Sequence, residues 1–151
     1  MNRHVFTIFC DDIRQEIGGK LSYIGVYGGQ MFVPSFPITL PKLCLAMSMV
    51  TPVDAPFRKL AMRILKDDTQ LAEGVLDETQ LASAVEASTD VPADERKDRI
   101  LALQSMFVFS PFQLEGPCTL KVRVETESGE LRGVGLRIDQ APAPAPDSPR
   151  Q

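Results

Sequence analysis

Apolar and polar residues alternate along most of this chain, and a period of two is typical of β-strands that bury one face. The clearest case is residues 119–125, which are followed by a turn around Gly129 and by a second alternating run at residues 134–138. This pattern predicts an antiparallel hairpin. Its expected inward residues are Leu120, Val122, Val124, Val134, Leu136 and Ile138.

Earlier segments predict further strands, separated by prolines that cannot donate to a sheet ladder. The expected strands cover residues 5–10, 21–33, 43–49, 60–64, 71–76 and 100–109. Glycines interrupt the run 21–33, which is therefore expected to bend or split. The run Ile100–Phe109 is apolar on both faces, and we expect it to be a strand in the centre of a sheet.

One predicted helix interrupts the strands. Asp77 can cap its N-terminus, and Gln80, three residues later, completes a capping box. The helix is expected to end near Ser88. The polar and charged residues 89–99 then predict a surface excursion.

Together these elements predict an all-β fold, an antiparallel β-sandwich of immunoglobulin-like or C2-like type with about eight strands and one short helix. An open barrel with a similar number of strands is the alternative. A chain of 151 residues fits one core, so residues 1–139 are expected to form a single domain. Residues 140–151 hold four prolines and no large apolar side chain, which predicts a disordered Pro/Ala-rich tail.

Charge, hydrophobic-run length and cysteine content limit the kind of partner and the cellular compartment that we expect. A formal net charge of −4 and a pI of about 5.0 argue against a nucleic-acid partner, which requires a basic face. The apolar stretch at residues 5–10 is too short for a secretory signal, and no run is long enough for a membrane span. Cys10, Cys44 and Cys118 lie in or beside apolar runs, so free buried thiols in the cytoplasm are expected.

We assign no catalytic, cofactor-binding or metal-binding residue from the sequence. His4 is the only histidine, and its place beside the N-terminus favours a surface role over catalysis. The three cysteines lack the short spacings of a zinc site. The segment 18–22 lacks the spacing of a phosphate loop and fits a hairpin turn. We therefore expect no cofactor, no small-molecule ligand and no enzymatic activity.

Acidic residues leave two alternatives open. Asp11, Asp12 and Glu16 lie in the first predicted connection and Asp54 in the third, and in an up-and-down sandwich both connections lie at the same end. Oxygen ligands at a sandwich end could make a calcium- or lipid-responsive module of C2-like type. Two of these carboxylates in one cleft could instead serve a small hydrolase. Solvated turn acids are the simpler interpretation.

The large apolar residues suggest a different function. Most of them belong to the core, but the runs Val5–Cys10 and Ile100–Phe109 are apolar on both faces. If the second sheet leaves one of those faces uncovered, the surplus forms an interaction patch. Our leading hypothesis is a non-catalytic β-sandwich that binds a protein partner or associates with itself, because sandwich edges can pair across a two-fold axis.

The first third of the chain carries a resemblance. The segment that begins Cys10-Asp11-Asp12-Ile13-Arg14-Gln15-Glu16-Ile17-Gly18-Gly19 and ends at Tyr27 is followed by Phe36-Pro37 and by residues 40–43. These residues resemble a family of small uncharacterised bacterial proteins. The resemblance is best over Phe6 to Leu43 and extends to Ile138. It implies a single bacterial cytosolic domain and carries over no functional residue.

Overall fold

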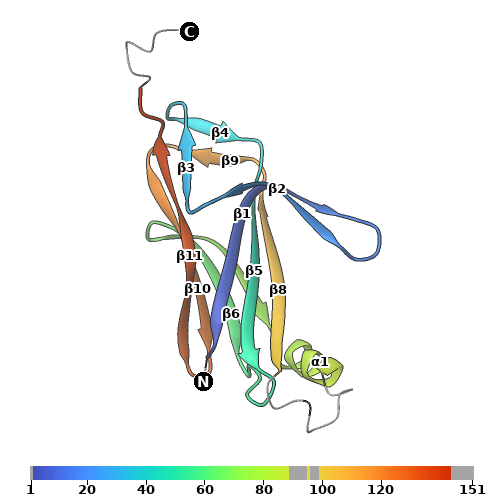
Figure 1. The fold of residues 1–151 in the computed structure, drawn as a ribbon. Helices are drawn as coiled ribbons and strands as arrows, with labels where there is room; N and C mark the ends of the chain where they lie inside the picture. Colours follow the sequence, from blue (N-terminus) through green and yellow to red (C-terminus); the bar gives the residue numbers. More distant parts are fainter. Residues whose placement is uncertain (1, 89–94, 96–98, 144–151) are drawn as a thin grey trace.

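Strands with one buried and one exposed face form a two-layered sandwich, which confirms the predicted all-β fold (Figure 1). The computed structural model describes residues 2–88, 95 and 99–143. Its elements are β1 (His4–Gln15), β2 (Leu21–Tyr27), β3 (Gln30–Val33), β4 (Ile38–Leu40), β5 (Leu43–Pro52), β6 (Leu60–Lys66), β7 (Thr69–Leu76), α1 (Glu78–Ser88), β8 (Ile100–Phe109), β9 (Phe112–Leu114), β10 (Cys118–Thr126) and β11 (Gly129–Gln140).

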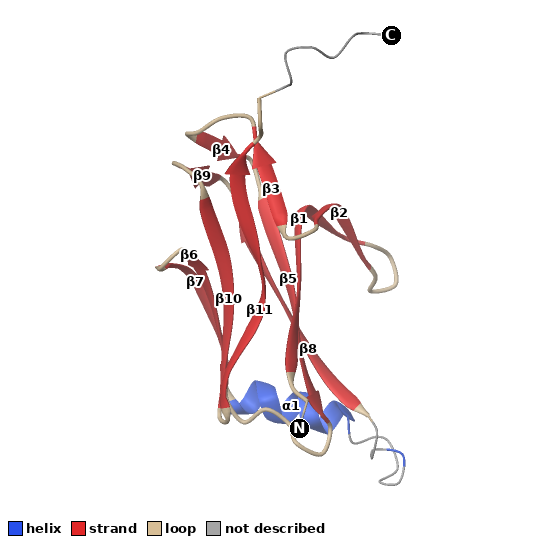
Figure 2. Cartoon of the chain, turned by 60° about the vertical axis from the view of Figure 1, so that its left-hand side comes forward, coloured by secondary structure: helices blue, strands red, loops and turns tan. Residues whose placement is uncertain are grey.

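Two sheets make up the layers. Sheet A has the strand order β2-β1-β5-β8, and sheet B has the order β3-β11-β10-β6-β7. Neighbouring strands are antiparallel, except that β3 runs parallel to β11. The short strands β4 and β9 pair at one end of the sandwich, and α1 lies at the other end (Figure 2).

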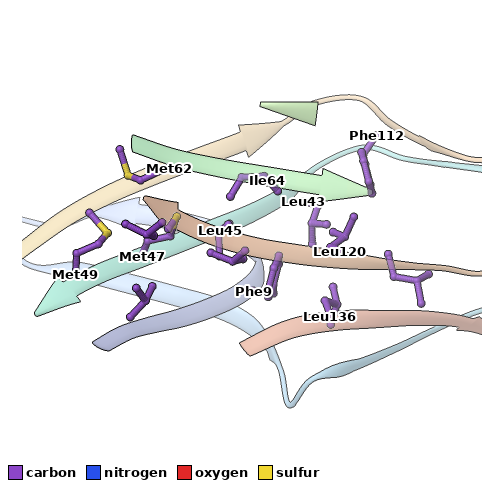
Figure 3. Packing of buried hydrophobic residues seen from close by; sticks show 14 of the residues in the cluster. Phe9, Leu43, Leu45, Met47, Met49, Met62, Ile64, Phe112, Leu120 and Leu136 are labelled. Atoms are coloured by element: carbon purple, nitrogen blue, oxygen red, sulfur yellow. The ribbon is translucent and has the colours of Figure 1, made fainter. Parts of the chain in front are cut away.

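The core lies between the two sheets. Leu45 of β5 and Leu120 of β10 are both 0% exposed and lie among the buried residues that fill the space between the layers (Figure 3). Burial of each such side chain contributes roughly 2 kcal/mol of transfer free energy. The predicted inward residues Val122 and Val124 are also fully buried, so the hairpin formed by β10 and β11 is confirmed.

Along one side of the sandwich β1 lies beside β11, so the two sheets meet there. The Thr7 hydroxyl donates a hydrogen bond of 2.6 Å to the Val134 carbonyl. At the neighbouring Gly133, an added Cβ would lie 2.7 Å from the Thr7 methyl group. A larger residue at position 133 would therefore have to displace the Thr7 side chain where β1 and β11 approach each other.

A β-bulge in the final hairpin corrects one predicted side-chain direction. Leu120 opposes Leu136, whereas Val122 opposes Gly133, so β11 contains one extra residue between these pairs. The bulge turns Val134 outward, where it is 71% exposed. The prediction that Val134 shares the inward face is therefore wrong.

The described residues contain eleven strands, more than the eight expected. The run 21–33 does split at its glycines, into β2 of sheet A and β3 of sheet B. The three-residue strands β4 and β9 lie in proline-rich stretches that were expected to be connections only. Strand β1 also continues to Gln15, so Asp11 and Asp12 belong to a strand and not to a connection.

Strand β8 lies at the edge of sheet A, so its predicted central position is wrong. It pairs with β5 along its whole length, from Phe109 opposite Leu43 to Ile100 opposite Pro52. Across the described residues, no strand pairs with its other side. Its odd-numbered residues are half-buried, and its even-numbered residues are exposed.

The predicted capping box is present at the start of α1. The Asp77 carboxylate accepts a hydrogen bond of 2.8 Å from the Gln80 N–H, and the Gln80 side chain accepts one of 2.9 Å from the Asp77 N–H. The helix ends at Ser88, as expected.

Replacing Asp77 with alanine is expected to lower the free energy of unfolding by about 1 kcal/mol, because the Gln80 N–H loses its acceptor. Urea unfolding followed by circular dichroism measures this change. Gln80→Ala, which removes the weaker half of the exchange, should cost less. Equal stability of Asp77→Ala and the wild type would contradict a capping role.

The last described strand continues one residue past the predicted domain end at residue 139. Strand β11 ends at Gln140, and the Ala141 N–H donates a hydrogen bond of 2.8 Å to the Val33 carbonyl. The greater part of the predicted tail (144–151) and of the surface excursion (89–94 and 96–98) lies outside the described residues. Among the helical residues that are described, none forms a segment long and apolar enough to cross a membrane.

Candidate functional site

Among the described residues, the part of sheet A in which β1, β5 and β8 pair carries no Asp, Glu, Lys or Arg on its outward face. Residues directly opposite in antiparallel strands share a face, so the pairing of β1, β5 and β8 places their even-numbered residues together on the outside. We call this surface the outer face. Its residues are His4, Phe6, Ile8, Cys10, Cys44, Ala46, Ser48, Val50, Pro52, Ile100, Ala102, Gln104, Met106 and Val108.

Several large apolar side chains of the outer face are open to solvent. Phe6 is 59% exposed, Met106 44% and Val108 56%. On the neighbouring β2, Val26 pairs with Cys10 and is also exposed. Contiguous apolar exposure of this kind is unusual on a monomer and marks interaction sites.

The outward face of sheet B has the opposite character. Glu130 alone lies within 4 Å of three arginines, Arg63, Arg123 and Arg132. Further pairs on this face are Lys59–Glu125, Lys121–Asp68 and Arg137–Asp139. The outward face of sheet B is thus covered with ion pairs, while the described residues of the outer face include no Asp, Glu, Lys or Arg.

A hairpin projects from the edge of sheet A. Strand β1 pairs with β5 only as far as Cys10, whereas its pairing with β2 continues to Gln15. Residues 11–25 therefore extend beyond the sheet as a two-stranded projection, which we call the arm (Figures 1 and 2). Gly18 and Gly19 form its turn with positive φ angles, as the sequence predicted.

Polar contacts fix the base of the arm. The Tyr27 hydroxyl donates a hydrogen bond of 2.5 Å to Asp11, and the Lys42 ammonium donates one of 2.7 Å to Asp12. Burial, together with the hydrogen bond to Asp11 and its negative charge, raises the pKa of Tyr27 to about 12. The hydrogen bond from Lys42 lowers the pKa of Asp12. Both acids therefore serve as anchors of the arm.

The arm and the outer face enclose a groove of about 160 Å³. The arm contributes Leu21 and Tyr23, and the sheet contributes Phe6, Ile8 and Met106. At Gly25, where φ is 68°, an added Cβ would overlap the Asp11 carboxylate. The bend at this glycine accompanies the change in direction that brings the arm over the sheet.

Residues 5–139 match a family of unknown function, DUF6941. The chain belongs to DUF6941. Neither a curated protein nor a solved structure matches it. The DUF6941 match begins within β1 and ends within β11, so the family unit is the sandwich together with its arm and outer face.

The three cysteines of this DUF6941 chain are free and buried. Cys10 and Cys44 oppose one another across β1 and β5, and the base of the arm covers both. Burial raises the pKa of the Cys10 and Cys44 thiols, and the neighbouring Cys44 and Asp11 raise the pKa of Cys10 further. The thiols therefore stay protonated and pack as small apolar groups.

The acids considered as a metal or catalytic site do not come together. Cys10 opposes Cys44 and His4 opposes Val50, so Asp54 lies beyond one end of this strand pair, and Asp11 and Asp12 lie beyond the other. The paired part of strand β5, which lies between these two ends, spans about 25 Å. The expected common end is therefore wrong, and these acids form neither a calcium site nor a shared cleft. Across residues 2–88, 95 and 99–143, no group of three potential metal ligands is found.

His4 and Glu16 likewise form no catalytic or metal-binding arrangement with the described residues around them. His4 is exposed and packs edge-to-face on Phe6, with 4.8 Å between ring centroids. Glu16 lies 3.8 Å from Arg14 at the tip of the arm. Neither arrangement orients a base or a ligand toward a cavity.

Arg3 is a largely buried charged residue that no sequence pattern predicted. Its side chain is 7% exposed and lies over the Phe57 ring at 4.7 Å. Its guanidinium donates hydrogen bonds to Thr51, Ser128 and Glu127, and to the carbonyls of Ala55 and Pro56. It thereby joins the N-terminus to two loops of the sandwich. No motif could have revealed it, because its partners lie 48 to 125 residues away.

Glu127 is held in the ionised state by these contacts. Burial alone would raise its pKa, but hydrogen bonds from Arg3 and from the N–H groups of Glu127, Arg58 and Lys59 lower it to about 2. The contact between Arg3 and Glu127 measures 2.6 Å. Its role is structural, since it joins the N-terminus to the β10–β11 turn.

Proposed function

We propose that this DUF6941 protein is a non-catalytic binding module that docks another protein on the outer face of sheet A. The observation that carries the proposal is the absence of charge from an exposed face that includes Phe6, Met106 and Val108. The centres of protein interfaces are depleted in charged residues and enriched in aromatic residues and methionine. The outer face has this composition, and the ion-paired face of sheet B does not.

The arm adds shape to this surface. It overhangs the outer face, so the groove between them can receive an apolar side chain of the docked protein. Tyr23 also lines the groove, and an aromatic ring with a hydroxyl group can contact both apolar and polar groups. The free thiols fit a reducing compartment, and we place this module in the cytoplasm of a bacterium.

A photo-crosslinking residue in place of Phe6 tests the proposal in the native host. We expect crosslinks to a discrete protein, which mass spectrometry identifies. With purified components, that protein should bind the wild type and lose about tenfold or more in affinity for Phe6→Asp, because a charge then enters an apolar contact.

The matched control places the same photo-crosslinker at Val75, an exposed apolar residue on the outward face of sheet B. It should give no specific product. Equal crosslinking at both positions, or unchanged binding of Phe6→Asp, would contradict docking on the outer face.

A further inference from the structure

The edge strands of the two sheets differ in how readily they could pair with another strand. Strand β3 has only four residues, β7 carries Glu73 and pairs across a β-bulge, and β2 is bent at Gly25. Short length, charge and irregular backbone are the usual means by which an edge avoids pairing. Three of the four edge strands in sheets A and B are therefore poorly suited to pairing with another strand.

Strand β8 has none of these features. Its ten residues include no charged residue, no glycine and no proline, and its ladder with β5 runs without a bulge. Such an edge extends about 33 Å. In the part of the chain that the structure describes, its backbone bonds to no strand other than β5. A long, regular and uncharged edge is a ready template for another strand.

We infer that two copies of this chain pair through β8, antiparallel, about a two-fold axis that passes beside Gln104. Opposite residues in an antiparallel ladder share a face. The axis therefore sets Ile100 against Val108 of the second copy, Ala102 against Met106 of the second copy, and Gln104 against itself. On the outer face a small side chain then meets a large one, and the two amide side chains can hydrogen-bond to each other.

The neighbouring registers fit less well. An axis beside Ser105 sets Gln104 against Met106 and leaves Ile100 beyond the ladder. An axis beside Leu103 sets Gln104 against Ala102 and leaves Val108 without a partner in the strand. Only the register centred on Gln104 uses residues 100–108 in full and pairs each exposed apolar residue with another.

The pairing closes on itself. Each copy uses the same edge, so the contact is isologous and ends at two subunits. The joined sheet has eight strands, with about eight backbone hydrogen bonds between the copies. Helix α1 lies at the end of the sandwich where β8 begins (Figure 1). Along the whole strand, the even-numbered side chains are exposed.

This inference goes beyond docking on the outer face, because it uses the edge of sheet A. A two-fold axis perpendicular to the sheet leaves both outer faces on the same side and unobstructed. The two proposals therefore fail separately: a monomeric protein that still crosslinks through Phe6 refutes only the pairing, and a dimer that gives no such crosslink refutes only the docking.

A charge swap on the axis tests the inference in the full chain. Light scattering should give the wild type twice the 16.6 kDa chain mass. Gln104→Lys and Gln104→Glu should each be monomeric, because like charges then oppose one another across the axis. Their equimolar mixture should recover the dimer. Gln104 is exposed, so both variants should fold, which thermal unfolding checks.

Cysteine crosslinking tests the register. The native cysteines are buried, so a mild oxidant should link Gln104→Cys into a covalent dimer and leave Ala102→Cys as single chains. The inference is overturned by a monomeric wild type, by a dimer that both charged variants retain, or by equal crosslinking at positions 102 and 104.

Discussion

Replacing Gly135 with alanine is expected to lower the free energy of unfolding by about 3 kcal/mol. An added Cβ would overlap the Leu120 carbonyl oxygen, which belongs to the backbone of the neighbouring strand. That strand cannot shift easily, because Leu120 and Val122 are fully buried. Urea unfolding monitored by circular dichroism gives the change in free energy, and we expect the unfolding midpoint to fall with little change in slope.

Alanine substitutions at two other glycines serve as comparisons for this measurement. Gly28→Ala meets no atom within 4 Å and should change stability by less than about 0.5 kcal/mol. Gly133→Ala meets the Thr7 and Val122 side chains, which can adjust. Its loss of stability should therefore lie between those of Gly28→Ala and Gly135→Ala. If Gly135→Ala were as stable as Gly28→Ala, the bulge geometry would be refuted.

Arg3→Met should cost about 3 kcal/mol, because it leaves several partners unsatisfied in a largely buried position. The substitution keeps the length of the side chain but removes the hydrogen bonds to Thr51, Glu127 and Ser128 and the contact of the cation with Phe57. Chemical unfolding at pH 7 measures the loss. Lys59→Met, which breaks the exposed pair with Glu125, is the matched control and should change stability by less than about 0.5 kcal/mol.

The stability of Arg3→Met should also depend on acidic pH differently from that of the wild type. The pKa of Glu127 is about 2 in the folded protein, below its ordinary value of 4.5, so ionised Glu127 stabilises the fold. This contribution is complete above about pH 5 and is lost as the pH falls toward 2, with a total of about 2 kcal/mol after allowance for solvent screening. Stability measured between pH 5 and pH 2 should fall less steeply for Arg3→Met than for the wild type. Parallel profiles would contradict the coupling of Arg3 to Glu127.

Local alternation predicted the final hairpin well, because both strands and their turn are continuous in sequence. Leu120, Leu136 and Ile138 are all fully buried. The bulge that turns Val134 outward was not predictable, since it depends on β1 passing beside β11. The strands β4 and β9 were missed for a similar reason. Three residues carry too little periodicity to be recognised, and each of these strands exists through its pairing with the other.

Strand β8 shows where the sequence pattern misleads. A run that is apolar on both faces usually lies in the centre of a sheet, yet Ile100 and Val108 are exposed at an edge. Periodicity reports that a side chain is apolar and cannot report what covers it. The surplus of apolar residues was visible in sequence, and the structure locates part of it on the outer face.

The candidate site was predictable only in its parts. The apolar runs at residues 5–10 and 100–109 both contribute to the outer face, but β5 lies between them in sheet A. The arm was hidden because Asp11 and Asp12 resemble turn residues, although they continue β1 and anchor the arm through Tyr27 and Lys42. The separation of Asp54 from these acids follows from the strand register.

The contrast between the two outward faces has a consequence for ionic strength. Screening by dissolved salt weakens the exposed ion pairs around Glu130 and Arg137. Sulfate and similar ions, which are excluded from protein surfaces, strengthen apolar contacts. Concentrated salt therefore loosens the side-chain network on sheet B while it favours whatever covers the uncharged face of sheet A.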